Sequence, residues 1–163
     1  MIDVVAFHGQ GSSPARMRYD CGDPDWITRY ADWQDWRHRE LIGTPFIAVG
    51  YSLGGDHIAQ LTRYPSVVKL RGIIVYESPI LYADPAPVDC PVVSIWNAYK
   101  PRTRHRRRIK AHSIKAWDQA SENTTHMVGR YRRHTKWIPR YPFIGQAWDQ
   151  SLNPFLADWV RRV

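Results

Sequence analysis

Cysteine and long apolar runs are both scarce in this chain. Its 163 residues include two cysteines, Cys21 and Cys90, which are too few for a disulfide framework and lack the paired spacing of a zinc site. We expect reduced thiols, with one bridge between them as the alternative, and no metal or cofactor. No apolar run approaches the ~18 residues of a membrane span, so we expect no transmembrane segment.

Acidic residues are also in short supply, and no leader is visible at the amino terminus. Lysine and arginine number 23 against 15 acidic residues, which gives a net charge of +8 and favours acidic partners through long-range attraction. An apolar pattern starts within the first five residues, with no basic segment or cleavage site before it. We therefore expect a cytoplasmic protein, and the sequence leaves its oligomeric state open.

Four short apolar runs indicate the strands of a buried parallel sheet. Each is almost continuous in Val, Ile, Ala and Phe, as is typical of strands covered on both faces. Helix-length stretches alternate with them, which indicates the α/β class. We expect a single domain over residues 1–163, with a mostly parallel sheet of about five strands flanked by helices. The four runs cover residues 3–7, 46–49, 72–76 and 92–96.

The stretches between these runs supply the expected helices and a fifth strand. Apolar residues at helical spacing and the positions of proline and glycine indicate the helices. The fifth strand is expected at about residues 109–117, and the closing helix is expected to be interrupted near Pro154. The helices are expected over residues 25–41, 54–64 and 127–134 and from residue 145 onward.

A G-x-S-x-G motif lies between an expected strand and an expected helix. It reads Gly50-Tyr51-Ser52-Leu53-Gly54, the nucleophile-elbow pattern in which small residues two before and two after the serine relieve crowding in a strained turn. The turn exposes the serine hydroxyl, and the following helix presents its amino terminus to a developing oxyanion. The motif therefore predicts Ser52 as a catalytic nucleophile.

With this elbow, the end of the first strand resembles the α/β-hydrolase family. The segment Phe7-His8-Gly9-Gln10-Gly11 is similar to that family's His-Gly oxyanion-hole turn, and the resemblance covers about residues 2 to 126. An acyl-transfer site needs two backbone donors for the oxyanion, one after the nucleophile and one from a loop after an earlier strand. The resemblance implies Leu53 and Gln10 as these donors and a structural role for His8.

The order of the family's catalytic residues along the chain is serine, acid, then a histidine in a loop after the last strand. This order implies His126 as the general base, because polar loop formers precede it and an expected helix follows it. The other histidines fit less well. His112 lies beside the expected fifth strand, His105 in a basic run, His57 on the helix after Ser52, and His38 and His134 at expected exposed helical positions.

The acid departs from the family's commonest pattern. That pattern places an aspartate after the strand at residues 92–96, where this chain has Asn97. Some members carry the acid after the preceding strand, which here implies Glu77 as the residue that orients the histidine. Asp118 and Glu122, near His126 in the sequence, and uncharged Asn97 are the alternatives.

The resemblance implies a small serine hydrolase that cleaves carboxylic esters through a Ser-His-acid triad and an acyl-enzyme intermediate. Residues 78–90 are too few to hold a cap domain, so we expect a lidless site open to short acyl esters or to accessible acyl groups on a larger substrate. A peptidase or amidase with the same triad is an alternative, because acyl-enzyme chemistry serves esters and amides alike.

The densest positive charge in the chain lies at residues 102–110, between Arg102 and Lys110. Such a run can bind nucleic acid or another polyanion through its phosphates, although many charge runs are only solvated faces. No base-reading motif accompanies it, so any binding is expected to be nonspecific. The rival prediction is a catalytically inert module on the hydrolase fold that binds polyanions, since a fold does not fix activity.

Overall fold

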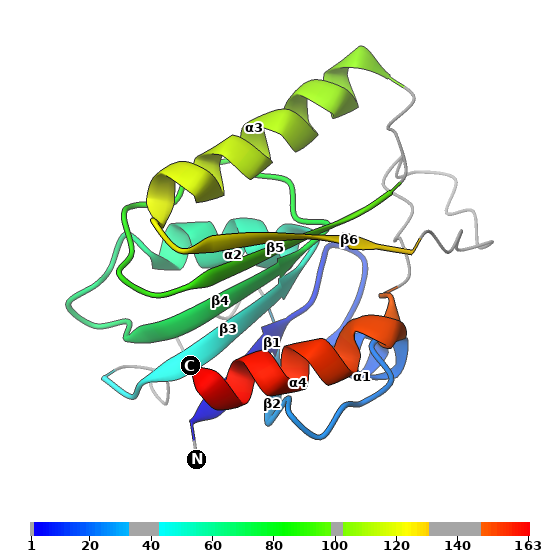
Figure 1. Ribbon diagram of the computed structural model, residues 1–163, viewed down its shortest axis with the longest axis vertical. Coiled ribbons are helices and arrows are strands. Elements are labelled where there is room, and N and C mark those ends of the chain that lie inside the picture. The colour runs from blue at the N-terminus through cyan, green and yellow to red at the C-terminus, as the bar shows by residue number, and fades with distance from the viewer. Residues whose placement is uncertain (1, 33–42, 99–102, 131–147) are drawn as a thin grey trace.

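The computed structural model describes residues 2–32, 43–98, 103–130 and 148–163. Within them, six parallel strands form one sheet in the order β2-β1-β3-β4-β5-β6, with helices on both faces (Figure 1). The α/β class expected from the sequence is therefore confirmed. The strands are β1 Asp3–Phe7, β2 Arg29–Ala31, β3 Phe46–Tyr51, β4 Leu70–Tyr76, β5 Val92–Asn97 and β6 Thr124–Gly129.

The helices form two layers. Helices α2 (Leu53–Leu61) and α3 (Arg104–Ala120) cover one face of the sheet, while α1 (Pro14–Asp20) and α4 (Asn153–Arg162) cover the other (Figure 1). A short 3-10 turn, η2 (Gln150–Leu152), leads into α4. Pro154 stands in the first turn of α4 rather than interrupting it, because the first backbone N–H groups of a helix have no partner to lose.

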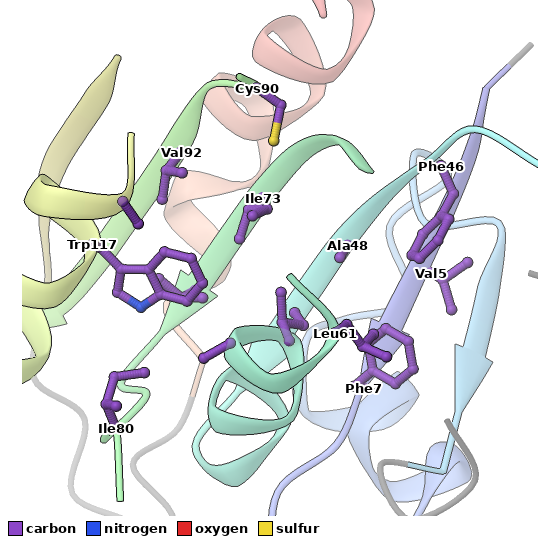
Figure 2. Close-up of a cluster of buried hydrophobic side chains, with 14 of the residues drawn as sticks. Val5, Phe7, Phe46, Ala48, Leu61, Ile73, Ile80, Cys90, Val92 and Trp117 are labelled. Atoms are coloured by element: carbon purple, nitrogen blue, oxygen red, sulfur yellow. The ribbon is translucent and has the colours of Figure 1, made fainter. Parts of the chain in front are cut away.

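Alternate residues of the central strands point to opposite faces, and both faces are buried. Phe7 and Ile73 pack under α2 and α3 together with Trp117 (Figure 2). Their neighbours on the other face, such as Ala6 and Ile74, pack against α1 and α4. This double burial explains the near-continuous apolar runs in the sequence, and each fully buried Val, Ile or Phe contributes about 1.5–3 kcal/mol.

Three expected elements are wrong. The strand expected at residues 109–117 is part of α3, whose buried residues Ser113, Ala116, Trp117 and Ala120 recur at helical spacing. Residues 124–129 form β6, so the helix expected over 127–134 does not begin there, and residues 131–134 lie outside the described part. Residues 29–31 form β2 instead of part of the helix expected over 25–41, of which residues 33–42 are not described.

The parallel sheet brings the ends of distant segments to one edge. The chain passes from β1 outward to β2 and returns on the other side of β1 to form β3. Strand order therefore reverses between β1 and β3, and ligands of open α/β sheets bind at the carboxyl edge beside such a reversal. The turn after β1 and the turn that holds Ser52 meet there.

Two expectations about composition can be compared with the structure. Cys21 and Cys90 are both buried and free, as expected of reduced thiols. In the described ranges, no helix is both long enough and apolar enough to cross a membrane.

Candidate active site

Ser52 occupies the sharp turn between β3 and α2. Its backbone has φ 53° and ψ −123°, a conformation that non-glycine residues rarely adopt and that costs about 1–3 kcal/mol. Its N–H donates to the carbonyl of Tyr76 at 3.0 Å, which continues the pairing of β3 with β4. The side chain is partly exposed, so the nucleophile elbow expected from the sequence has the strained geometry of such a turn.

Close packing around the elbow explains its glycines. A Cβ atom on Gly54 would lie 2.0 Å from the carbonyl oxygen of Phe7, and one on Gly50 would lie 2.5 Å from Gly55 Cα. Because these neighbours are backbone atoms, they cannot rotate away from a methyl group. The motif thus fixes α2 directly against the end of β1.

The turn after β1 contacts the elbow. A Cβ atom on Gly9 would lie 2.8 Å from Ser52 Cβ and 3.3 Å from Ser52 Oγ, so this turn lies within van der Waals reach of the serine. Gln10 follows Gly9 in the same turn and is exposed. Leu53 begins α2, and the first N–H groups of a helix have no acceptor within it. The structure therefore places Leu53, and the turn that contains Gln10, next to Ser52.

Glu77 follows β4 directly and lies beside Ser52 in the register of the sheet, because Tyr51 pairs with Tyr76. It also has a positive φ, 49°. Its carboxylate Oε1 accepts a hydrogen bond from the Asn97 N–H at the end of β5. Burial raises the pKa of Glu77 to about 7, although this hydrogen bond and the charge of Lys110 act in the opposite direction.

A polar network beneath Glu77 was not expected from the sequence. The Tyr76 hydroxyl accepts from the Asp149 N–H at 2.7 Å and donates to Asn97 Oδ1 at 3.4 Å. The Asp149 carboxylate accepts from the Arg130 N–H at 2.5 Å and from the Ser151 hydroxyl at 2.6 Å. Burial alone would raise the pKa of Asp149, but these hydrogen bonds outweigh it and lower the pKa. The network joins the ends of β4, β5 and β6 to the start of η2.

The loop after Glu77 is tied to the elbow and to α2. Ser78 donates its hydroxyl hydrogen to the Gly50 carbonyl at 3.1 Å. The buried carboxylate of Asp56 accepts from the Leu81 N–H at 2.8 Å and from the Tyr82 N–H at 3.3 Å. Residues 77–91, all described, contain neither helix nor strand. Nothing in this connection forms a cap, in agreement with its expected shortness.

His126 is not brought to Ser52. It lies within β6, level with Ser94 and Val75 rather than at the carboxyl edge, and β4 and β5 separate its strand from β3. Three strand spacings of about 4.8 Å place the two backbones about 14 Å apart. The prediction of His126 as general base therefore does not fit the structure, because the residue forms part of a strand instead of an edge loop.

The alternative acids also lie away from Ser52. Asp118, in the last turns of α3, accepts from His126 Nε2 at 2.6 Å, and both side chains are about half exposed. Glu122 is exposed in the turn that precedes β6, at the opposite edge of the sheet from Ser52. Asp118 is thus the partner of His126, and neither carboxylate reaches the elbow.

Three other described histidines, His8, His57 and His112, contact groups other than Ser52. His8 is buried, its Nδ1–H donates to the Gly9 carbonyl at 2.7 Å, and its Nε2 lies 3.3 Å from Asp32 Oδ1, in line with the structural role expected for it. His57 packs edge to face on Phe7 with 5.2 Å between ring centroids. His112 pairs with Asp84 at 2.7 Å, far along α3. His38 and His134 lie outside the described residues.

Comparison with known proteins yields a likeness of fold. No protein-family model matches the chain, and no curated protein matches it. A solved structure described as "RedJ with PEG molecule bound in the active site" is similar over 99% of this chain and 91% of its own, with a TM-score of 0.56 and 11% sequence identity. At that identity the likeness concerns the course of the backbone, and the α/β fold is what this chain shares with RedJ.

Proposed function

We propose that this protein is a serine hydrolase that cleaves carboxylic esters, with Ser52 as its nucleophile. The observation that carries the proposal is the backbone of Ser52, a non-glycine residue at φ 53° in a turn between strand and helix. Such strain persists only where the surroundings enforce it, and it concentrates at functional sites. The packing of Gly9 against Ser52 adds support, because it brings the turn after β1 next to the same hydroxyl.

The proposed reaction uses the backbone for electrostatic stabilisation. A general base removes the Ser52 hydroxyl proton while Oγ attacks the acyl carbonyl, and the N–H groups of Leu53 and Gln10 hold the resulting oxyanion. Collapse breaks the bond to the alcohol, which takes the proton back from the base. Water then attacks the acyl-enzyme by the same steps in reverse and releases the carboxylic acid.

Glu77 is the proposed acid of this triad. It is the only one of the three candidate carboxylates, among Glu77, Asp118 and Glu122, that lies at the carboxyl edge next to Ser52. The Asn97 N–H holds one oxygen of this carboxylate at the carboxyl edge, where a triad acid has to stand to orient a histidine. Asn97, the uncharged alternative, uses its side-chain oxygen for the Tyr76 hydroxyl and supports Glu77 instead.

We propose His134 as the general base from its position in the sequence alone, since residues 131–147 lie outside the described part of the chain. The last described strand is β6, Thr124–Gly129, and the first histidine that follows it in the sequence is His134. The order Ser52, Glu77, His134 keeps the serine-acid-histidine order of the triad, with the base after the last described strand. The proposed triad therefore has His134 in the role expected of His126, and the proposed reaction is unchanged.

The decisive experiment is labelling by a fluorescent fluorophosphonate, which reacts with activated serines. Wild type should label at Ser52, as read by mass spectrometry of the modified peptide. Ser52→Ala and His134→Ala should lose the label, whereas His126→Ala should label as wild type does. The exposed Ser66→Ala is the matched serine control. Absence of wild-type labelling, or labelling of another serine, would contradict the proposal.

Substrate assays then separate the ester reaction from its alternative. Hydrolysis of p-nitrophenyl acetate without cleavage of a matching p-nitroanilide would support an esterase. Faster turnover of the anilide would favour a peptidase or amidase using the same residues.

A further inference from the structure

The exposed face of α3 carries positive charge that no ion pair within the described part of the chain balances. The helix holds six lysines and arginines, and its one carboxylate, Asp118, lies in the last turns. Arg104, Arg107 and Arg108 are exposed at the other end. Among the described residues, these three side chains form no ion pair and no hydrogen bond. The cationic face, defined here as Arg104, Arg107 and Arg108, is therefore a source of uncompensated charge.

This arrangement opposes the helix that carries it. The amino-terminal end of a helix is the positive pole of its dipole, so cations there are repelled. Arg104 also lies three residues from Arg107 and four from Arg108, the spacings at which side chains of equal charge face and repel each other. No acidic residue stands in the first turn of α3 to offset them. The face would gain stability by binding an anion.

Three other exposed arginines in the described ranges are each paired with a carboxylate. Arg16 contacts Asp20 at 3.0 Å, Arg18 contacts Asp23 at 3.0 Å, and Arg161 contacts Asp158 at 2.8 Å. The net charge of +8 is thus unevenly distributed. Its unpaired part on α3 forms a concentrated positive field, as expected of a binding surface for a polyanion.

The cationic face lies at the same edge of the sheet as Ser52. Lys110 Nζ, on the next turn of α3, donates to the Asn97 carbonyl at 3.2 Å and lies 5.4 Å from the centre of the Trp96 ring. These contacts fix the start of α3 beside the carboxyl end of β5, and Figure 1 shows the first turns of the helix on that side of the sheet. A polyanion bound along this face would therefore lie on the side of the sheet where the strands end.

The positions of the apolar residues of α3 indicate whether the cationic face suits a membrane surface or a nucleic acid. A helix that lies on a membrane inserts an exposed apolar face into the headgroup region. Ala116, Trp117 and Ala120 are instead buried against the sheet, and none of the large apolar side chains exposed in the described residues lies on α3. The face offers charge without an apolar anchor, which matches the repeated phosphates of a nucleic-acid backbone.

We propose that the cationic face of α3 binds the phosphate backbone of nucleic acid without reading its sequence. The surface is separate from the nucleophile, so binding does not depend on the proposed hydrolysis. Ser52→Ala should bind as wild type does. If the protein proves to have no hydrolase activity, the proposal of nucleic-acid binding is unaffected. If it does not bind nucleic acid, the proposal of ester hydrolysis at Ser52 is unaffected.

The test measures the fluorescence anisotropy of a labelled 20-base-pair duplex titrated with the protein between 50 and 200 mM NaCl, conditions in which about 0.9 of a counterion is released for each neutralised phosphate. Wild type should bind, with affinity that falls steeply as salt rises. The plot of log K against log salt has a negative slope. In the triple variant Arg104→Gln, Arg107→Gln, Arg108→Gln the magnitude of this slope should be smaller by about 2 to 3. Affinity at 50 mM NaCl should fall at least about tenfold.

The matched control removes the same charge from paired arginines. Arg16→Gln, Arg18→Gln, Arg161→Gln lowers the net charge by the same amount but should keep wild-type affinity within about twofold, since binding is local. Equal weakening by both triple variants would overturn the proposal, as would absence of wild-type binding at 50 mM NaCl. Binding to phosphatidylglycerol vesicles that matches binding to the duplex, and is lost in the α3 variant, would assign the face to a membrane instead.

Discussion

The elbow around Ser52 and the cationic face of α3 lie at the same edge of the sheet but are built in opposite ways. In the elbow, backbone atoms pack so closely that Gly50 and Gly54 accept no side chain, and Ser52 is held at a positive φ. On α3 the arginine side chains are exposed and sterically unconstrained, and the unfavourable term is electrostatic. Each region thus carries a locally unfavourable term, backbone strain in the elbow and charge repulsion on α3, and such terms concentrate at functional sites.

The strongest test of this comparison is to break the packing of the elbow. Gly54→Ala places a methyl carbon 2.0 Å from the Phe7 carbonyl oxygen, so α2 must move away from β1. We expect a loss of more than about 3 kcal/mol of unfolding free energy, or failure to fold. Urea denaturation measures the loss.

Gly11 provides the control for this change. It has a positive φ of 71° but no atom within 4 Å of an added Cβ. Gly11→Ala should therefore cost only about 1 kcal/mol, the backbone term without the clash. Equal losses at Gly11 and Gly54 would mean that conformation, not packing, dominates the elbow.

Substitution of Glu77 tests whether the ionised carboxylate of the site lowers the stability of the folded protein. Its pKa of about 7 in the folded state lies above the ordinary 4.5, so the folded state binds the proton more tightly than the unfolded state. Wild-type stability should then fall as pH rises from about 4.5 to 7. Glu77→Gln cannot ionise and should be more stable than wild type at pH 8, by on the order of 2 kcal/mol.

Below about pH 4.5 the advantage of Glu77→Gln should vanish, because the wild-type carboxyl is then neutral in both states. The same variant should label with fluorophosphonate about 10² to 10⁴ times more slowly, since its amide cannot stabilise an imidazolium. The exposed Glu122→Gln should change neither property. A stability difference independent of pH would argue against a buried carboxylate that titrates near 7.

The backbone strain of Ser52 predicts a smaller effect. Glycine adopts φ 53° without steric cost and alanine does not, so Ser52→Gly should unfold at higher urea than Ser52→Ala, by about 1 kcal/mol. The exposed Ser66, which has no positive φ, should show no such preference for glycine. If Ser52→Ala is the more stable of the two, the elbow is not strained in solution.

The smallest expected effect concerns the cationic face. The triple glutamine variant of Arg104, Arg107 and Arg108 should raise the melting temperature by about 2–4 °C at low salt, because it removes repulsion from the start of α3. In 0.5 M NaCl the difference should disappear through screening. The triple variant of Arg16, Arg18 and Arg161, which loses ion pairs, should show no rise. A lower melting temperature for the α3 variant would contradict the argument from repulsion.

The strands that could be predicted from the sequence are those with a strong local signal. β1, β3, β4 and β5 are apolar over several consecutive residues, and burial on both faces demands that pattern wherever it occurs in the chain. β2 has three residues and lies at the edge of the sheet. It carries too short a pattern to distinguish it from a helix with similar composition.

The residues of the candidate site also divide into those with a local sequence signal and those without one. Ser52, Leu53 and Gln10 could be placed because their motif depends on adjacent residues and on a turn that only glycines permit. His126 could not be placed, because its environment depends on which distant strand lies beside it. The polar network of Tyr76, Asn97 and Asp149 joins residues up to 73 positions apart and leaves no local pattern.

The sequence by itself determined the elbow, the charge of α3 and the alternation of buried strands with helices. The physical reason is that crowding, charge and hydrophobic periodicity act between residues that are close along the chain. Only the tertiary structure decided that residues 124–129 pair with β5. This pairing places His126 within a strand and away from Ser52. Parallel pairing joins segments far apart in the sequence, so its outcome is set by burial and backbone hydrogen bonds across the whole sheet.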